Sequence, residues 1–327
     1  MKFILCLCLF FFASCSREDS GVKIIGGEKT SAPAYFVSLY LEGTSQPYCG
    51  GSLIAENLVL TAAHCLNLTT LDGSAVAAHY VVVGSADLDV SSTAQVYRVS
   101  NQIVHPDYDA TRNLDNDIAL LELSEPVDLA SCGSYCRAIP WLPNQQASTL
   151  SGIGALAQIA GWGQTSASSA TSASDADAVY PSRLQVGQSR IVACGLGSYS
   201  YNGRTWPLSP NMMCASGANL SRPADTCIGD SGSGLIVGLN QGQPYVAGIT
   251  SWGEDKPCGE RNLPSVYTRV SNYDDWILSY VDPVAYAARI EQQKAQQAAS
   301  ASSGGGGSSS PFMVLALLGL AILRRRW

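Results

Sequence analysis

The 327-residue chain has little of what most metal sites need. It contains only three histidines, His64, His79 and His105, and it has neither an H-E-x-x-H motif nor two C-x-x-C pairs. Those spacings are the usual signatures of zinc sites. We therefore expect no metal and no cofactor. Internal repeats of about 20–50 residues are also absent, which excludes the repeat architectures.

Charge is scarce as well. Only 14% of the residues are charged, and the net charge of the chain is −7. Residues 24–282 carry −12, because the two ends of the chain together contribute +5. An acidic surface argues against nucleic acid and against an anionic membrane as the main partner. It weakly favours cationic peptides.

The C-terminal apolar run is short. Phe312–Leu323 has twelve residues, whereas a membrane-spanning helix needs roughly 20. A linker that is first Ala/Gln-rich and then Gly/Ser-rich precedes it (residues 283–310), and the final segment, 311–327, ends in an Arg cluster. This combination resembles the sorting tails of exported Gram-negative bacterial proteins, which implies cleavage near the glycines by a rhomboid-type protease. An ordinary membrane anchor is the alternative.

The N-terminal segment has the features of a secretory signal. Residues 1–15 combine a lysine, an apolar run and a small-residue end, which is typical of a signal peptide that is removed. A buried N-terminal helix is one alternative. The sequence FASC also resembles a bacterial lipoprotein cleavage box, so a lipid on Cys15 is a second possibility. We predict an exported protein, extracellular or at a bacterial cell surface.

Cysteines are plentiful after this segment. The chain has eleven, of which Cys6, Cys8 and Cys15 lie in the first fifteen residues, so an even number remains. Export makes disulfides the expected state of these eight.

The body of the chain has the pattern of β structure. Short apolar runs rich in Val, Ile, Tyr and Thr are separated by turn residues, without long helical patterns between them. This predicts an all-β sandwich or barrel. Helical turns are expected at Ala63–Leu66 and Tyr273–Val281, and a long polar loop at Thr165–Tyr180.

One serine raises the question of catalysis. Ser231 lies in ADTCIGDSGSGL, but a hydroxyl is a weak nucleophile unless a base, itself oriented by a third group, is within reach. His64 ends a strand pattern in LTAAHC, and Asp117 directly precedes the apolar run IALLEL. A poorly solvated acid needs a partner, and an imidazole N–H is suitable. Asp115 is the nearby competitor for that role.

Ten motifs in register resemble the chymotrypsin-fold serine proteases, closest to the trypsin-like branch. They are KIIGG, CGGSLI, LTAAHC, DNDIALL, AGWG, NMMCA, DTCIGDSGSG, ITSWG, PSVYTRV and DDWI, and the resemblance covers about residues 24–282. The resemblance implies two six-stranded antiparallel β-barrels with a C-terminal helix. The chain order His64, Asp117, Ser231 matches this fold and differs from the α/β-hydrolase and subtilisin orders.

The resemblance also implies a mechanism. Ser231 is the nucleophile, His64 the base and then the acid, and Asp117 orients the imidazole. The backbone N–H groups of Gly229 and Ser231 form the oxyanion hole. Residues 16–23 form an activation propeptide: cleavage after Lys23 frees the amino group of Ile24, which pairs with Asp230, so the uncut chain is a zymogen.

Substrate preference follows from the same resemblance. Asp225 falls where trypsin-like members hold the acid that attracts Arg or Lys; a solvated loop acid is the alternative. Ser251, Trp252 and Gly253 form one wall and bind substrate backbone. Ser265 departs from the usual glycine, and its hydroxymethyl group either narrows the pocket or hydrogen-bonds Asp225. Thr226 also adds bulk.

Disulfide pairing is carried over for six cysteines: Cys49–Cys65, Cys194–Cys214 and Cys227–Cys258. Cys132 and Cys136 remain and are expected to pair locally. The acids of the calcium loop found in trypsin-like members are not evident, so we predict no bound calcium.

Two other functions stay open. A catalytically silent, surface-binding relative of the fold is the main alternative, although all three triad positions are filled. The other is a processing protease with a narrow target, set by loops such as Thr165–Tyr180.

Overall fold

The computed structural model describes most of the central part of the chain. Two units are distinguished, residues 1–274 and residues 275–327, and each is described by itself. The predicted signal peptide, propeptide and sorting tail lie outside the described residues, as does nearly all of the predicted loop Thr165–Tyr180. The described residues are 24, 28–29, 32–66, 68–69, 75–76, 80–87, 95–111, 113–165, 180–195, 198–201, 204–217, 224–253 and 264–302.

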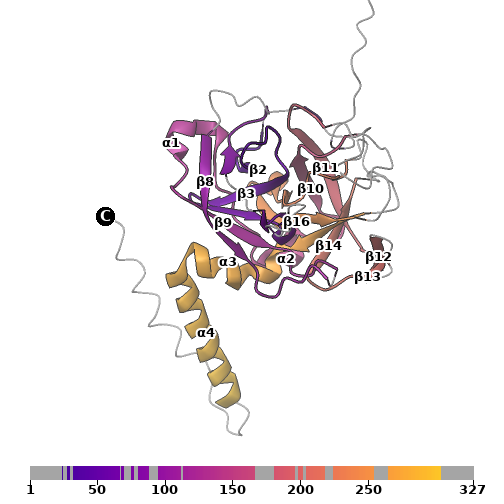
Figure 1. The fold of residues 1–327 in the computed structure, drawn as a ribbon. Helices are drawn as coiled ribbons and strands as arrows, with labels where there is room; N and C mark the ends of the chain where they lie inside the picture. The colour runs from indigo at the N-terminus through magenta and orange to yellow at the C-terminus, as the bar shows by residue number, and fades with distance from the viewer. Residues whose placement is uncertain are drawn as a thin grey trace, which may run out of the picture. The chain divides into compact units, whose positions relative to one another are not determined.

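Six strands close the first barrel (Figure 1). Their inward side chains are mainly Val and Leu, which suit a pleated, buried surface; Val37, Leu53 and Leu121 are fully buried. In spatial order the strands are β2 (Phe36–Tyr40), β3 (Cys49–Ala55), β4 (Leu58–Thr61), β9 (Ala119–Leu123), β8 (Gln95–Val104) and β7 (Tyr80–Val83).

A second barrel follows in the chain. In spatial order its strands are β11 (Gln185–Val192), β10 (Leu156–Gly161), β15 (Gly234–Val237), β16 (Tyr245–Trp252), β17 (Ser265–Arg269) and β14 (Met212–Ser216), with β1 (Glu28–Lys29) added at β11. Antiparallel pairing between β11 and β14 closes this barrel. Its core includes Ile159, Leu235 and Tyr267. The predicted pair of six-stranded antiparallel barrels is therefore confirmed.

Small elements complete the described chain. The hairpin β12 (Ser198–Tyr201) and β13 (Arg204–Pro207) and the pair β5 (Leu68–Thr69) and β6 (Ala75–Val76) form separate two-stranded sheets. The helical segments are η1 (Ala63–Cys65), α1 (Leu129–Cys132), η2 (Gly133–Tyr135), α2 (Asn144–Leu150), η3 (Leu239–Gln241), η4 (Val270–Tyr273), α3 (Asp274–Val281) and α4 (Pro283–Ser302). Among the helices that the structure describes, none combines the length and the apolar character needed to cross a membrane.

Disulfides are present, as expected. The structure joins Cys49 to Cys65, Cys132 to Cys136, and Cys194 to Cys214. Cys227 is also disulfide-bonded, while its expected partner Cys258 lies outside the described residues. The Cys49–Cys65 bridge ties β3 to η1, which carries His64.

Candidate active site

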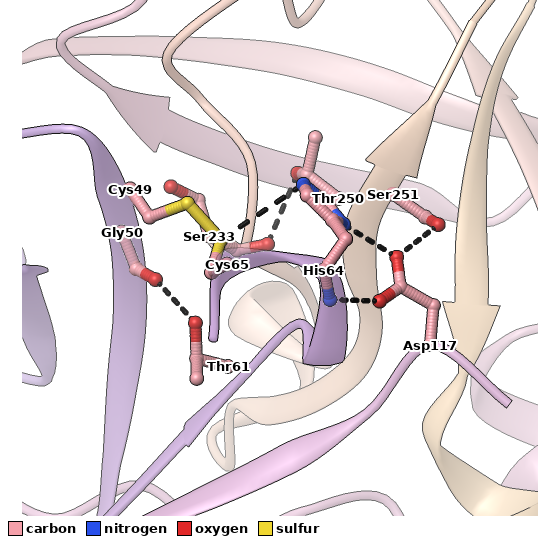
Figure 2. Close-up of a disulfide and its surroundings, with 9 residues drawn as sticks. All are labelled: Cys49, Gly50, Thr61, His64, Cys65, Asp117, Ser233, Thr250 and Ser251. Atoms are coloured by element: carbon pink, nitrogen blue, oxygen red, sulfur yellow. Dashed lines mark hydrogen bonds and ion pairs between the residues drawn. A yellow bond between two sulfur atoms is a disulfide. The ribbon is translucent and has the colours of Figure 1, made fainter. Parts of the chain in front are cut away.

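His64 and Asp117 meet at the edge of the first barrel. His64 lies in η1, directly after β4, and Asp117 lies just before β9, which pairs with β4. The imidazole Nδ1 is 2.7 Å from Asp117 Oδ2, and the His64 backbone N–H donates to Asp117 Oδ1 at 2.8 Å (Figure 2). These two contacts fix both the position of the carboxylate and the orientation of the ring.

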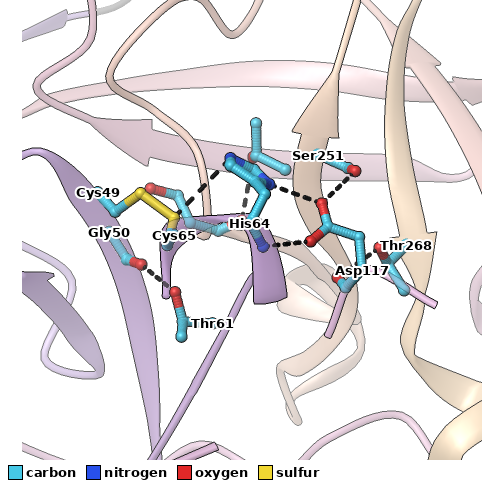
Figure 3. Close-up of polar contacts among 10 residues, drawn as sticks. Cys49, Gly50, Thr61, His64, Cys65, Asp117, Ser251 and Thr268 are labelled. Atoms are coloured by element: carbon cyan, nitrogen blue, oxygen red, sulfur yellow. Dashed lines mark hydrogen bonds and ion pairs between the residues drawn. A yellow bond between two sulfur atoms is a disulfide. The ribbon is translucent and has the colours of Figure 1, made fainter. Parts of the chain in front are cut away.

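The second barrel completes the surroundings of Asp117. This residue has no exposed surface, yet its polar atoms are satisfied. The Ser251 hydroxyl, at the end of β16, donates to Oδ2, and the Thr268 hydroxyl, on β17, donates to the backbone carbonyl of Asp117 at 2.8 Å (Figure 3). A buried carboxylate is stable only with such partners.

Two opposing effects act on the imidazole of His64. Burial lowers its pKa, but the negative charge of Asp117 and the hydrogen bond to it together raise the pKa above the ordinary value of 6.5. The side chain still has 22% of its surface exposed. A neutral imidazole held by an acid at Nδ1 presents Nε2 as a proton acceptor, which is the arrangement of a general base.

Ser231 lies in a tight turn beside this pair. Its carbonyl accepts a hydrogen bond from Gly50 N–H at 2.8 Å, and Gly232 N–H donates to the Thr250 carbonyl at 2.9 Å. Gly232 has φ +80°, and a Cβ there would lie 2.3 Å from Thr61 Oγ1. The turn therefore requires glycine and brings Ser231 to the junction of the two barrels.

The hydroxyl of Ser231 is not hydrogen-bonded to His64. Within the described ranges the structure has no hydrogen bond from that hydroxyl, and the contact of His64 Nε2 is with Cys65 Sγ at 3.9 Å. The structure thus brings the acid and the base into direct contact, and it places the serine nearby through Gly50. Catalytic hydrogen bonds often tighten only when substrate binds.

Two backbone N–H donors lie in the serine turn, one of them on the serine itself. Gly229 has φ +97°, and a Cβ at this position would lie 3.1 Å from Gly163 Cα. The N–H groups of Gly229 and Ser231 donate to no acceptor within the described part of the chain. Two unoccupied N–H donors beside a serine hydroxyl are suited to stabilising an oxyanion.

Asp230 is a second fully buried acid. Its carboxylate accepts hydrogen bonds from Gly163 N–H at 2.8 Å and from Cys227 N–H at 2.9 Å. The pKa of Asp230 is raised to about 7, because burial, the largest effect, outweighs the two backbone hydrogen bonds that lower the pKa, and the charge of Asp225 raises it further. Ile24 is buried in the core of the second barrel.

Asp225 is 8% exposed and lies close to the residues predicted to surround it. The Ser265 hydroxyl donates to Asp225 Oδ1 at 2.7 Å, and Thr226 N–H donates to the same oxygen at 3.0 Å. The Thr226 hydroxyl is 3.2 Å from the Tyr267 hydroxyl. Of the two predicted roles for Ser265, the structure has the hydrogen bond.

The predicted wall residues divide into different roles. The side chain of Ser251 faces Asp117, a contact that the sequence did not reveal because 134 residues separate the two. Trp252 packs in an apolar cluster with Met212 and Val266. Among the atoms that the structure describes, none lies within 4 Å of a Cβ built on Gly253.

Asp115 and His105 lie outside this constellation. Asp115 accepts hydrogen bonds from Ser209 and Asn211 rather than from His64. His105 stacks edge-on against Tyr273, with ring centroids 5.0 Å apart, and His79 lies outside the described residues.

One group of potential metal ligands occurs in the described ranges. Cys49, His64 and Cys65 have ligand atoms within 4.8 Å of one another. The two sulfur atoms are joined in a disulfide, so they offer no thiolate to a metal ion.

Comparison with known proteins gives consistent matches. The family model described as Trypsin matches residues 24–277. Trypsin-3 of Salmo salar is 35% identical over 80% of this chain and 94% of that protein. Ovochymase of Halocynthia roretzi is 27% identical over 87% of this chain, which spans only 17% of that protein. The solved structure of neuropsin, a serine protease expressed in the limbic system of mouse brain, matches with a TM-score of 0.60 and 27% identity, covering 78% of this chain and 99% of that one.

Proposed function

The chain belongs to the trypsin family of serine proteases, and on that premise we propose that it is an endopeptidase that cleaves peptide bonds after Arg or Lys. The observation that carries the proposal is the contact between His64 and the fully buried Asp117. A buried carboxylate that holds Nδ1 of an imidazole orients that imidazole as a base, and a base next to a serine can activate the serine hydroxyl as a nucleophile.

The proposed reaction follows the triad scheme. Ser231 Oγ attacks the scissile carbonyl while His64 Nε2 takes its proton, and Asp117 stabilises the imidazolium that forms. The N–H groups of Gly229 and Ser231 stabilise the oxyanion of the tetrahedral intermediate. His64 then protonates the leaving amine, and water, activated by the same imidazole, releases the acyl group from Ser231.

Activation by cleavage after Lys23 is part of the proposal. Asp230 is buried among backbone amides, without a cation among its described contacts, and Ile24 is buried in the same barrel. The new ammonium of Ile24 would supply the missing charge. A buried ion pair stabilises a structure only when both partners are present, so the uncut chain would be inactive.

Specificity for basic side chains rests on Asp225. A nearly buried carboxylate at the base of a pocket favours a cationic side chain through charge-assisted hydrogen bonds. Trp252 and Gly253 would contact the substrate backbone, bound as an added strand. Protein and peptide substrates are the proposed partners.

Export is proposed from the N-terminal segment and is consistent with the disulfides. The relatives named above come from animals, so they give no support to the predicted Gram-negative source. Rhomboid-type processing of the tail and a lipid on Cys15 accordingly rest on sequence composition alone.

The test is hydrolysis of short chromogenic peptides ending in Arg, Lys, Phe or Ala. The chain is first cut after Lys23, and Ser231→Ala, treated identically, serves as the control. We expect cleavage after Arg or Lys that the control lacks. Cleavage only after Phe or Ala would contradict the role of Asp225. No turnover, with Ile24 shown to be free, would instead favour the silent, surface-binding relative.

A further inference from the structure

A groove on the second barrel is lined by residues that have no part in the predicted active site. It encloses about 500 Å³ between the end of α2, the start of β10 and η3. Three exposed apolar side chains line it: Ile153 (77% exposed), Leu239 (43%) and Leu156 (41%). Single exposed apolar residues are common on protein surfaces, whereas several around one hollow are typical of an interaction site.

The strand β15 ends too early to pair with the whole of β10. The two strands pair at Gln158 and Ile236, and the same antiparallel register would place Leu156 opposite Gly238. Gly238 has φ +79°, and at this residue the chain leaves β15 and enters η3. Among the described residues, Leu156 therefore has no strand partner on the β15 side of β10.

The backbone of Leu156 faces this unpaired side. On the other side of β10, Leu156 lies opposite Arg190 of β11, and the Ile191 N–H donates to the Ala155 carbonyl. This pattern makes Leu156 and Arg190 a non-hydrogen-bonded pair, so the N–H and C=O of Leu156 point away from β11. Neither group has a hydrogen-bond partner in the described part of the chain. They form a short strand edge in the groove, to which an extended peptide can add.

The groove is positively charged, although the domain around it is acidic. Arg190 lines the groove, and none of the described lining residues is an acid. The Arg190 Nη1 donates to the Gly154 carbonyl, and the guanidinium has no carboxylate partner within the described ranges. Arg183, by contrast, pairs with Asp87 at 2.8 Å. A guanidinium without an acidic partner suits a carboxylate supplied by another molecule.

From the apolar lining, the strand edge and the charge, we propose that this groove binds an extended segment of a partner protein in which apolar and acidic side chains alternate. The segment exchanges backbone hydrogen bonds with Leu156, covers Leu239 with an apolar side chain and pairs an acidic side chain with Arg190. Because Leu156 and Arg190 are directly opposite each other, their Cβ atoms are about 5 Å apart, so one segment can reach both. The binding does not depend on the proposed protease activity.

The first test is peptide binding by calorimetry to the full chain that carries Ser231→Ala, which prevents cleavage. The probe is acetyl-Val-Glu-Val-Glu-Val-amide, compared with a peptide that has Lys in place of Glu and with one that has Ser in place of Val. We expect the probe to bind, and the other two to bind more weakly by roughly tenfold or more. The net negative charge of the domain acts against this order, because it attracts the lysine peptide. No binding of the probe, or equal binding of the lysine peptide, would overturn the proposal.

Variants of the groove assign the binding to its residues. Arg190→Gln should weaken binding of the probe by roughly tenfold, because a charge-assisted hydrogen bond is lost. Leu239→Ser should also weaken it, and since Leu239 is exposed, this substitution should leave the fold intact. The matched controls are Arg98→Gln and Val96→Ser, an exposed arginine and an exposed valine on β8 of the first barrel, which should leave binding unchanged. Unchanged binding in Arg190→Gln and in Leu239→Ser would place the peptide elsewhere and overturn the proposal.

A last pair of peptides tests the added strand. Methyl groups on alternate backbone nitrogens block one edge of the extended probe or the other, and only one edge can face β10. We expect one methylated form to lose binding and the other to keep it, and the amide resonance of Leu156 to shift when the probe is added. Retention of binding by both forms would overturn the strand addition. A shift of the Leu156 resonance that follows protein concentration without peptide would show that a second copy occupies the groove, which also overturns the proposal.

Discussion

Two buried carboxylates, Asp117 and Asp230, have different surroundings. Both residues have no exposed surface. Asp117 contacts a titratable imidazole and the hydroxyl of Ser251, whereas Asp230 accepts hydrogen bonds from the backbone of Gly163 and Cys227. Asp117 therefore already has the partner whose charge it is suited to stabilise. Asp230 is held by backbone dipoles, and burial raises its pKa to about 7.

The difference shows how one fold can use burial in two ways. Around Asp117, burial excludes water from the pair of Asp117 and His64. Both members of this pair are already in contact, so the pair is preorganised. Around Asp230, burial makes the ionised form costly until a cation arrives. The first carboxylate serves the proposed chemistry, and the second serves its proposed activation.

Breaking the Asp117 pair should have the largest effect. Asp117→Asn keeps the shape but removes the charge, and we expect kcat to fall about 10⁴-fold, which is the size of the effect that this change has in the chymotrypsin triad. Without the charge of Asp117, burial alone lowers the pKa of His64, so the acid limb of residual activity should move to lower pH. A pH series of kcat measures both effects.

The matched control for that substitution is Asp115→Asn. Asp115 lies two residues away but accepts hydrogen bonds from Ser209 and Asn211. Its kcat and acid limb should stay close to those of the parent. A loss comparable to that of Asp117→Asn would show that the acid role had been assigned to the wrong residue.

Removing the charge of Asp230 should stabilise the uncut chain at alkaline pH. Because the folded pKa lies above the unfolded value of 3.8, the unfolded chain ionises first, and stability falls as pH rises from about 4 to about 7. That fall amounts to roughly 4 kcal/mol by linkage. Asp230→Asn should lack it, which urea unfolding between pH 4 and pH 8 measures, with Ser231→Ala in both proteins to prevent self-cleavage.

The same substitution should have the opposite consequence after cleavage. With Lys23 cut, Asn at position 230 offers no charge to the ammonium of Ile24, and peptide hydrolysis should be lost. Two outcomes would contradict the role proposed for Asp230. One is the same pH dependence of stability in the uncut proteins with and without Asp230→Asn, and the other is full activity of the cut Asp230→Asn protein.

The smallest expected effect concerns the hydroxyl that joins Asp117 to the second barrel. Ser251→Ala removes one hydrogen bond to Oδ2 and leaves the His64 contact in place. Loss of a hydrogen bond to a charged group suggests roughly a tenfold decrease in kcat, with little change in KM. Steady-state kinetics distinguish this from a binding defect, in which KM would rise and kcat would not change.

Much of the architecture could be predicted from the sequence, because the motifs occur in a fixed order. The alternation of short Val- and Ile-rich runs with turns predicted an all-β barrel or sandwich, and the resemblance specified the two barrels that the structure shows. The helical turn at Ala63–Leu66 corresponds to η1, and Tyr273–Val281 corresponds to the end of η4 and α3. These signals are local, so short windows of sequence contain them.

Other features depend on contacts between residues that lie far apart in the sequence, so no short segment of sequence contains both partners. Ser251 and Thr268 reach Asp117 from 134 and 151 residues away. Two roles were open for Ser265 on sequence grounds, and only the position of β17 near Asp225 selects the hydrogen bond. The positive φ angles of Asn113, Leu114 and Asn116 were also not foreseen, since left-handed backbone is uncommon outside glycine.

The hydrogen bond between Ser251 and Asp117 means that the site is complete only when residues far apart in the sequence have all been synthesised. A ribosome completes the first barrel, which ends with β9 at Leu123, long before it adds Ser231 and Ser251. A nascent chain at that stage carries His64 and Asp117, but it lacks Ser231, and it lacks the Ser251 hydroxyl that donates to the Asp117 carboxylate. We therefore expect translation products that end before Ser231 to be inert, so that any hydrolytic activity begins only after Ser231 has been added.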